Sequence, residues 1–407
     1  MKILLVHNFY GSSAPSGENT VFLAERNLLR EHGHEVVEFT RHSDEIRKLG
    51  KRGSVIGSLS TPWNPFSSAR MRRLLEKEKP DVVHVHNTFP LLSPSVFRAA
   101  AGIGTATVLT LHNYRTFCAA GIPMRGSEPC VECLELHSVL PALRYQCYRN
   151  SLPATLPVAL MISLHRRIET WTRYVDAFIA LTEFQKKELA RGGLPIDRMH
   201  VKPHFYPNAP EPVIPGRREV KVVYIGRLGR EKGIHVLLEA WNRWGKEAPR
   251  LELIGDGPER QSLVEMAERS AASDQIKFTG QLPFDEAQKH LARSTLLMLP
   301  SLCYEGFPMV IREAFALGVP VVASRLGSMP YIINDESDGR LFEPGNSEDL
   351  LRTVRGLWTD RERLAAMARN ARRTFEEKYT ADANYTLLMK IYDRAIEQRK
   401  RKMRAGR

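Results

Sequence analysis

The stretch Pro300–Ser328, which reads PSLCYEGFPMVIREAFALGVPVVASRLGS, constrains the fold of this chain more than any other. A short apolar run precedes it at 296–299, and a second apolar run lies inside it at 319–323. Between the two runs come a Gly-Phe-Pro turn and then a helical pattern that stops at Gly318, a residue type that commonly ends helices. This order of strand, loop, helix and strand is typical of a parallel α/β sheet.

Two carboxylates bracket the Gly-Phe-Pro turn. Glu305 lies in the loop that follows a predicted strand, and open α/β sheets bind their ligands beyond the carboxyl ends of strands. Glu313 lies near the start of the predicted helix, where backbone N–H groups favour anions. A carboxylate there competes with phosphate, so we expect Glu313 to hold hydroxyl groups such as those of a ribose. The alternative is an acidic helix start on a solvated face.

The pattern E-G-F-P-x-V-x-x-E-A-x-A-x-G-x-P-V-V-A-S resembles the E-x7-E signature of the retaining glycosyltransferases of family 4, which have the GT-B fold. The resemblance implies an α/β architecture of two doubly wound parallel-sheet domains that face one another across a cleft. It also implies that Gly306 and Phe307, in the turn, belong to the donor-binding site with Glu305 and Glu313. In this family Glu305 would hold hydroxyl groups of the sugar that reacts.

The length of 407 residues is sufficient for two domains with full cores. Strands and helices alternate in both halves, and a proline-rich linker without periodicity follows His204. We predict an acceptor-side α/β domain over 1–207, a nucleotide-sugar-binding α/β domain over 208–378, and a helix with a basic tail over 379–407. In GT-B proteins such a helix crosses back to the first domain. We further predict an irregular connection over 44–65 and a disordered tail over 399–407.

The formal net charge of +13 indicates an anionic partner, such as a sugar nucleotide, phospholipid head groups or nucleic acid. No apolar run reaches the roughly 18 residues needed to span a bilayer, and the start does not have the pattern of a signal peptide. We therefore expect a cytoplasmic protein, with peripheral binding to the inner face of the membrane as a further hypothesis. The apolar run Leu156–Leu164 is interpreted either as a core helix or as an interfacial patch beside basic residues.

Three positions in the first half are candidates for the site. Ser16 and Gly17, at a predicted helix start, would meet a phosphate or an acceptor, or would simply form a turn and cap. The usual G-x-G-x-x-G fingerprint is absent from this loop. His112 lies just past the end of a predicted strand, and its setting L-T-L-H-N resembles the family position that contacts the donor sugar. His84 and His86 are interpreted as structural.

Four of the five cysteines fall between 118 and 147, namely Cys118, Cys130, Cys133 and Cys147. Reduced, clustered thiols with one C-x-x-C pair indicate a structural zinc ion, while a disulfide and free buried thiols remain the alternatives. With four protein ligands such an ion would have no open position, so we expect no catalytic metal or cofactor.

The second half carries a predicted diphosphate site. Arg227 and Lys232 flank a glycine-bearing loop that opens a helix, and two cations beside a helix start suit a diphosphate. Solvated loop charges are the alternative. The pattern G-R-L-x-x-x-K-G resembles the family's donor-diphosphate motif, which favours the site. Gly255 and Gly257, after the next strand, permit close backbone approach, and the family places this loop beside the nucleotide.

These observations predict a retaining glycosyltransferase that moves a sugar from a nucleotide-sugar donor to a glycan or lipid-linked acceptor, in cell-surface polysaccharide synthesis. A sugar-nucleotide epimerase of the same fold is the first alternative. A basic nucleic-acid-binding protein is the second, but the chain lacks the interleaved aromatic residues that such a groove requires, so we expect no nucleic-acid partner.

Overall fold

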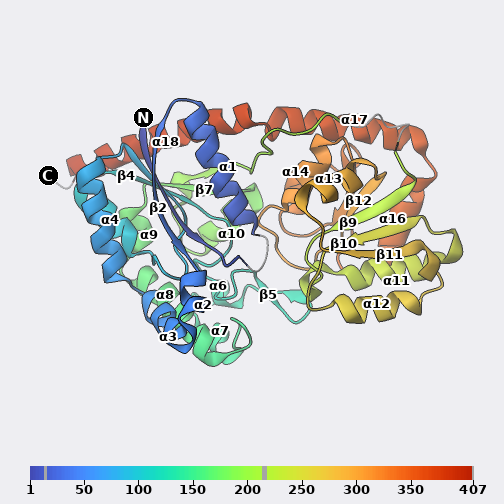
Figure 1. Ribbon diagram of the computed structural model, residues 1–407, viewed down its shortest axis with the longest axis horizontal. Helices are drawn as coiled ribbons and strands as arrows, with labels where there is room; N and C mark the ends of the chain where they lie inside the picture. The colour runs from blue at the N-terminus through green and yellow to red at the C-terminus, as the bar shows by residue number, and fades with distance from the viewer. Residues whose placement is uncertain (13–15, 213–217, 406–407) are drawn as a thin grey trace. The chain divides into compact units, whose positions relative to one another are not determined.

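The computed structural model describes residues 1–12, 16–212 and 218–405, and it divides into two compact units (Figure 1). Unit 1 comprises Met1–Pro123, Val131–His204 and the chain from Asn384 onward. Unit 2 comprises Met124–Cys130 and Phe205–Ala383. Parts of the predicted loop over 8–17, of the linker and of the basic tail lie outside the described residues.

Unit 1 is built on a six-stranded sheet in the order β2-β1-β3-β4-β7-β8, in which neighbouring strands pair in parallel. The strands are β1 (Lys2–Phe9), β2 (Glu35–His42), β3 (Val82–Asn87), β4 (Ala106–Thr110), β7 (Ala177–Ala180) and β8 (Met199–Val201). Their connections contain α1 (Gly17–Glu31), α2 (Asp44–Lys48), α3 (Gly50–Ser60), α4 (Pro65–Glu78), α5 (Ser95–Ile103), α6 (Glu132–Glu135), α7 (Leu140–Arg144), α8 (Leu152–Arg167), α9 (Thr170–Tyr174), α10 (Glu183–Arg191) and the short helix η1 (Ile196–Arg198). The central strands β3, β4 and β7 are buried along their whole length, as parallel strands covered on both faces should be.

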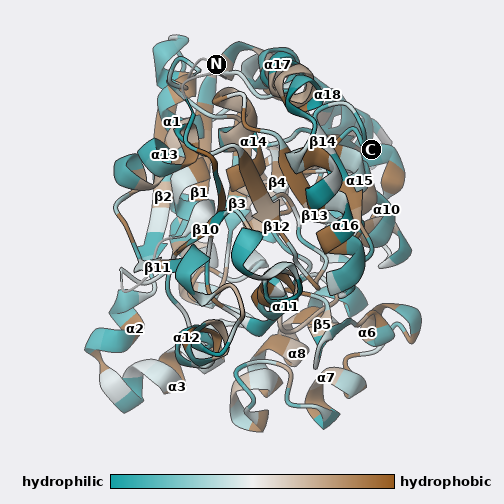
Figure 2. Cartoon of the chain, turned by 90° about the vertical axis from the view of Figure 1, so that its right-hand side faces the viewer, coloured by the Kyte–Doolittle hydropathy of each residue, from teal (hydrophilic) through white to brown (hydrophobic). Residues whose placement is uncertain are grey.

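Unit 2 repeats this architecture with a parallel sheet in the order β11-β10-β9-β12-β13-β14. Its strands are β9 (Lys221–Ile225), β10 (Arg250–Ile254), β11 (Ile276–Gly280), β12 (Leu296–Leu299), β13 (Val321–Ser324) and β14 (Gly339–Phe342). Its helices are η3 (Arg230–Lys232), α11 (Ile234–Trp244), η4 (Gly245–Glu247), α12 (Arg260–Glu268), η5 (Ser273–Gln275), α13 (Phe284–Ala292), α14 (Met309–Ala316), α15 (Met329–Ile332), α16 (Ser347–Trp358) and α17 (Arg361–Lys378). Figure 2 shows strands β12 and β13 as hydrophobic ribbons, in agreement with their complete burial.

The last helix, α18 (Ala381–Ala405), completes the core of unit 1. Its buried residues Leu388, Ile391, Tyr392 and Ala395 pack against side chains of β1, β4 and β7, with Tyr385 partly buried beside them. These residues recur at helical spacing in the sequence, which is the pattern of a helix with one buried face. The predicted disordered tail is wrong over the described residues, because the helix continues to Ala405 and Arg399 is buried against Asp176.

Another correction concerns the segment 44–65, which contains two helices instead of an irregular connection. Helices α2 and α3 cross closely at Gly53, where an added Cβ would lie 1.9 Å from the backbone oxygen of Ile46. The contact that orders the segment is therefore between backbones, and it leaves no apolar periodicity in the sequence. The segment 118–147 likewise contains a short hairpin of β5 (Met124–Arg125) and β6 (Glu128–Pro129) before α6 and α7.

Helix α8, which contains the run Leu156–Leu164, is buried on one face and exposed on the other, so it is a core helix and the interfacial patch stays a prediction. Val158, Met161 and Ile162 are buried on its inner face. Leu152, Leu156 and Leu160, spaced by four residues, are about half exposed on its outer face, at 47%, 45% and 51%. Among the described helices, none is both long and apolar enough to cross a membrane.

Candidate active site

The loops that follow β9, β10 and β12 in unit 2 meet at the carboxyl ends of these neighbouring strands. Gly255 has a φ of +140°, and an added Cβ would lie 1.9 Å from the backbone oxygen of Gly226. Gly233, with a φ of +66°, would similarly clash with the backbone oxygen of Pro300 at 2.0 Å. Only glycine fits where the backbones approach this closely, so these residues fix the loops that carry the predicted site.

The structure brings two of the predicted site residues, Lys232 and Glu305, into direct contact. The Nζ atom of Lys232, at the end of η3, donates to Oε1 of Glu305 over 2.5 Å, and the hydroxyl of Ser301 donates to the same oxygen over 2.8 Å. Burial works to lower the pKa of Lys232, but the carboxylate of Glu305 outweighs it, so the pKa is raised. Lys232 is therefore a fixed ammonium group at the sheet edge where ligands of such folds bind.

Arg227 lies on the same loop as Lys232, and its side chain is exposed. Within the residues that the structure describes, its guanidinium group has no hydrogen-bond or ion-pair partner, while its backbone oxygen accepts from the hydroxyl of Tyr224 over 2.8 Å. The loop thus holds one cation in an ion pair and leaves another open to an anionic ligand.

Glu313 is buried in α14, where Gln288 of α13 donates to its Oε2 atom over 2.9 Å. Burial raises the pKa of Glu313 despite the nearby Arg312, whose guanidinium lies 3.8 Å away. The alternative of an acidic group on a solvated helix face is therefore excluded. Phe307, after Gly306, is also buried and its ring packs against that of Tyr379 at 5.6 Å.

His112 in unit 1 belongs to a group of histidines at the carboxyl ends of β3 and β4. Its Nε2 atom lies 3.1 Å from Nδ1 of His86, and its ring stacks between those of His86 and His204 at 5.3 and 5.2 Å. Burial, with a further effect of His204 and His86, holds the pKa of His112 well below its usual value. His112 is consequently a neutral imidazole at neutral pH, able to accept or donate a hydrogen bond.

A buried ion pair between Glu25 and Lys202, which the sequence analysis missed, lies beneath these histidines. Nζ of Lys202 donates to Oε2 of Glu25 over 2.7 Å and to Asn384 of α18 over 3.1 Å. Oε1 of Glu25 lies 3.0 Å from Nδ1 of His84 and 3.2 Å from Nε2 of His86. His84 also contacts the hydroxyls of Tyr392 and Thr110, each at 2.8 Å.

This network supports the structural interpretation of His84 and His86, and it adds that His86 links His112 to Glu25. In the sequence, Glu25 resembles any acidic residue of an amphipathic helix. A possible signal was the H-x-H spacing in β3, which places both rings on one face of a strand. Glu25, His84 and His86 also bring three potential metal-ligand atoms within 4.8 Å of one another. The carboxylate of Glu25 is already paired with the ammonium group of Lys202.

A small cavity of about 70 Å³ lies beside His112 and is lined also by His86, Asn113 and Arg115. Asn113 donates to Glu18 of α1 over 2.9 Å, and the guanidinium of Arg115 stacks over the ring of Phe89 at 4.3 Å. Burial raises the pKa of Glu18. Helix α1 begins at Gly17, and the hydroxyl of Ser16 caps it by accepting from Asn19. The predicted cap is therefore present, and contact of Ser16 and Gly17 with a phosphate or an acceptor stays a prediction.

The cysteines are divided between the two units. Cys118, Cys133 and Cys147 belong to unit 1, and Cys130 belongs to unit 2. Burial, and to a lesser degree the thiols of Cys133 and Cys147, raise the pKa of Cys118 to about 12. Cys133 and Cys147 both pack beside the small apolar cluster of Phe89, Ala142 and Met161. The zinc site stays a prediction.

Comparison with family models matches both halves of the chain. The model described as Glycosyltransferase Family 4 matches residues 15–207, and the model described as Glycosyl transferases group 1 matches residues 210–374. Two parallel α/β units, each matched by one of these models, have the GT-B architecture of a glycosyltransferase. The chain belongs to the family of glycosyltransferases that these two models describe.

Among curated proteins, the chain is 27% identical over 397 residues to a sulfoquinovosyl transferase of Arabidopsis thaliana, covering 94% of this chain and 71% of that protein. It is 24% identical to a putative teichuronic acid biosynthesis glycosyltransferase of Bacillus subtilis, covering 87% of this chain and 88% of that protein.

Among solved structures, the fold is similar to that of Anabaena HepE in complex with UDP, with a TM-score of 0.65, 17% identity, and coverage of 97% of this chain and 100% of that one. It is also similar to a sucrose-phosphate synthase from Thermosynechococcus elongatus, with a TM-score of 0.66, 16% identity, and coverage of 96% and 98%. These structures support the assignment of the GT-B fold.

Proposed function

We propose that this glycosyltransferase takes a nucleotide-sugar donor and transfers the sugar, with retention of configuration, to a glycan or lipid-linked acceptor. The observation that carries the proposal is the contact between Lys232 and Glu305 at the sheet edge of unit 2. It joins a diphosphate-binding cation to the carboxylate that the family resemblance assigns to the reacting sugar. The solved complexes of Anabaena HepE with UDP and with UDP-glucose make uridine the first base to test.

In the proposed reaction, the leaving diphosphate gains negative charge as the glycosidic bond breaks. Lys232 and Arg227 would stabilise that charge, because preformed cations at a developing anion lower the barrier without reorganisation. Glu305 would hold sugar hydroxyl groups and Glu313 the ribose. A covalent nucleophile is not part of the proposal; the acceptor hydroxyl attacks on the face that the diphosphate leaves, and the diphosphate takes its proton.

The acceptor-side residues would come from unit 1. Asn113 and Arg115 line the small cavity next to His112, and Asn113 donates to Glu18, so the set combines an amide, a guanidinium and a carboxyl group. Such a set can recognise the hydroxyl or anionic groups of a glycan. His112 keeps, as an expectation, the contact with the donor sugar that the resemblance implies.

Thermal shift with uridine, guanosine and adenosine diphosphates and their sugar conjugates tests the donor. One nucleotide should raise the melting temperature, because a ligand that binds only the folded state stabilises it. Nuclear magnetic resonance of the product then gives the anomeric configuration, and inversion would refute retention. Incubation of the sugar nucleotide without acceptor separates transfer from epimerisation, since only an epimerase would convert the sugar.

We also propose that unit 1 docks on an anionic membrane. The outer leucines of α8 lie in a helix that ends in Arg166 and Arg167, and α3 exposes Val55, Ile56 and Leu59. Apolar side chains flanked by cations suit the interface of an anionic bilayer, where each basic residue contributes about 1 kcal/mol.

Co-sedimentation with anionic vesicles tests the docking. Binding should be strong at low salt and should fall in the variant Leu156→Gln with Leu160→Gln. The control Ile196→Gln removes an equally exposed apolar residue from η1 and should change nothing. Absence of pelleting at every ionic strength would exclude the docking.

The structural zinc is proposed for Cys118, Cys130, Cys133 and Cys147, which would order the segment after His112. Elemental analysis of protein purified without chelator should find about one zinc per chain, and Cys130→Ser should lower it. If the protein is fully active and folded without metal, the zinc proposal is wrong and the cysteines are reduced thiols in a loop.

A further inference from the structure

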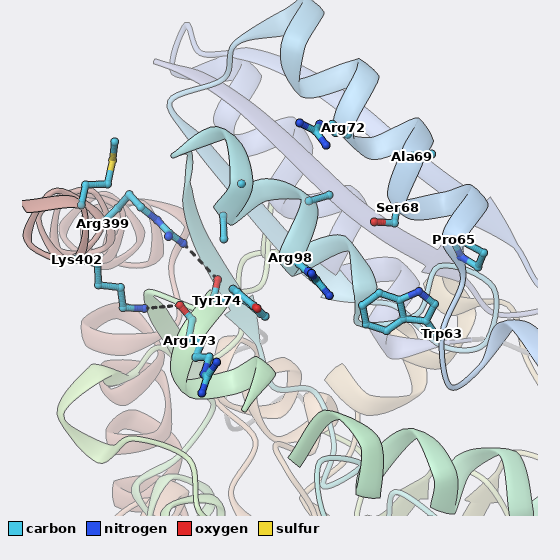
Figure 3. Close-up of a pocket in the computed structure, with 14 residues that line it drawn as sticks. Trp63, Pro65, Ser68, Ala69, Arg72, Arg98, Arg173, Tyr174, Arg399 and Lys402 are labelled. Atoms are coloured by element: carbon cyan, nitrogen blue, oxygen red, sulfur yellow. Dashed lines mark hydrogen bonds between the residues drawn. The ribbon is translucent and has the colours of Figure 1, made fainter. Parts of the chain in front are cut away.

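A basic groove of about 680 Å³ lies on unit 1 among helices α4, α5, α9 and the end of α18 (Figure 3). Five of its 14 lining residues are basic, and none of these 14 described residues is acidic. The basic residues are Arg72, Arg98, Arg173, Arg399 and Lys402.

The groove lies at the amino ends of strands β4 and β7, whereas the predicted site residue His112 of unit 1 lies at the carboxyl end of β4. Arg399 and Lys402 pair with Asp176, which directly precedes β7. Asp176 also accepts from the backbone N–H of Thr107 over 3.0 Å, at the start of β4. His112, in contrast, follows the carboxyl end of β4. The groove therefore serves something other than the proposed donor and acceptor sites.

The cations of the groove exceed the anions beside it. Arg399 Nη2 lies 2.7 Å and Lys402 Nζ 3.0 Å from the single carboxylate of Asp176. Burial is the main cause that lowers the pKa of Lys402; the carboxylate of Asp176 raises it, and Arg198 and Arg399 lower it by smaller amounts.

The other side of the groove has an open cation. Arg98 of α5 is exposed, and no described residue forms a hydrogen bond or ion pair with it. Arg72 and Arg173 pair only with Glu76 and Glu169 on their own helices, in exposed surface pairs that a ligand can displace at little cost. The ring of Trp63 is held in place by stacking on His165 at 5.8 Å and adds an apolar wall.

We propose that this groove binds a ligand with several phosphate groups, either a free phosphorylated polyol or the phosphorylated head group of a lipid. Arginine is well suited to phosphate because its planar fork donates two parallel hydrogen bonds. The volume lies in the range of small-molecule sites, and the cations come from four separate helices, so a ligand that carries phosphates at several positions fits better than a single phosphate.

Calorimetric titration of the full chain with inositol hexakisphosphate tests the proposal. The variant Arg98→Gln with Arg72→Gln should bind about 10- to 100-fold more weakly, since each substitution removes charge-assisted hydrogen bonds. Both side chains are exposed, so the variant should fold normally. Lys390→Gln is the matched control, because it removes an exposed cation from α18 outside the groove. The substitution Lys232→Ala, in the other unit, should also leave this binding unchanged.

Vesicles of phosphatidylcholine with a minor component of phosphatidylinositol phosphate distinguish the two sources. A loss of binding to the soluble probe with vesicle binding unchanged supports a free ligand, and a loss of binding to the vesicles as well supports a lipid head group. If the groove variant binds both probes as the unchanged protein does, the proposal is overturned. The same holds if Lys390→Gln weakens binding equally, because then only the general positive field of the protein attracts the probes.

Discussion

The candidate site of unit 2 and the histidine network of unit 1 are built in different ways. In unit 2, the residues Arg227, Lys232, Glu305 and Glu313 come from two short stretches of chain, and each stretch carries a motif that resembles one of the family. In unit 1, Glu25 and Lys202 lie 177 positions apart, and the histidines between them come from separate strands and loops. A site made of short motifs can be predicted from residues that are neighbours in the sequence, whereas a network assembled across a sheet cannot.

The two regions also differ in charge. Unit 2 presents an exposed arginine and an ion-paired lysine to a ligand. In unit 1, the buried ion pair of Glu25 and Lys202 lies beside the neutral imidazole of His84. All the described histidines whose pKa is lowered by burial lie in unit 1, namely His7, His34, His84, His112, His165 and His200. We therefore expect unit 2 to respond mainly in ligand binding and unit 1 mainly in stability.

The largest effect is expected for Glu25→Gln. Removal of the charge leaves Lys202 as an uncompensated buried cation. We expect this to lower the free energy of unfolding by about 3–5 kcal/mol. Urea denaturation measures the loss. Glu169→Gln, which breaks an exposed pair with Arg173, should cost no more than about 1 kcal/mol. Equal stability of the two variants would contradict the role of the Glu25–Lys202 pair.

Glu305→Gln should be nearly as severe, but mainly in turnover. Loss of a preorganised polar contact with the reacting group typically lowers kcat about 10²- to 10³-fold, or roughly 3–4 kcal/mol. The variant should fold, with a lowered melting temperature because Lys232 loses its ion-pair partner. Glu265→Gln, in an exposed pair of α12, should keep full activity. An assay that finds full transfer by Glu305→Gln would remove this carboxylate from the site.

Acid should destabilise unit 1 before unit 2. Burial lowers the pKa of His7 to about 3 and those of His84 and His165 to about 4, whereas an unfolded histidine titrates near 6.5. Below that value the unfolded chain binds protons that the folded chain does not, so stability falls as pH falls towards the folded pKa values. The slope approaches about 1.4 kcal/mol per pH unit for each histidine.

Hydrogen exchange at neutral and mildly acidic pH measures where this loss occurs. Protection should decrease first in the strands of unit 1, by roughly 1 kcal/mol per histidine for a fall from about pH 6.5 to 5.5, or about 3 kcal/mol for the three together. Parallel loss of protection in both units would show that the buried histidines do not set the acid sensitivity.

The smallest effect is expected for Lys232→Ala. Loss of one charge-assisted hydrogen bond should weaken binding of a nucleoside diphosphate by roughly 1.5–3 kcal/mol, or about 10- to 100-fold. Calorimetry with the nucleotide found by thermal shift gives the value. Lys246→Ala, an exposed lysine of the same unit, is the control. Unchanged affinity in folded Lys232→Ala would place the diphosphate elsewhere.

The sequence was sufficient for the α/β architecture of both halves because apolar strand runs and helical periodicity are local signals. It also identified the stretches that hold Lys232 and Glu305, since a glycine loop before a helix has few other uses. The contact between these two residues was not visible, because 73 positions separate them. The burial of Glu313 was likewise decided by Gln288 on a different helix.

What the sequence alone determined is therefore the order of elements, the two-domain organisation and the motifs at strand ends, all of which depend on residues near one another in the chain. Only the tertiary structure decided that Glu25 and Lys202 form a buried pair, that α2 and α3 cross at Gly53, and that the basic residues after Gln398 continue a helix and line a groove. The physical reason is common to all three. A charged or small residue looks the same in the sequence whether it is solvated or buried, and its role is fixed by partners that folding brings from elsewhere.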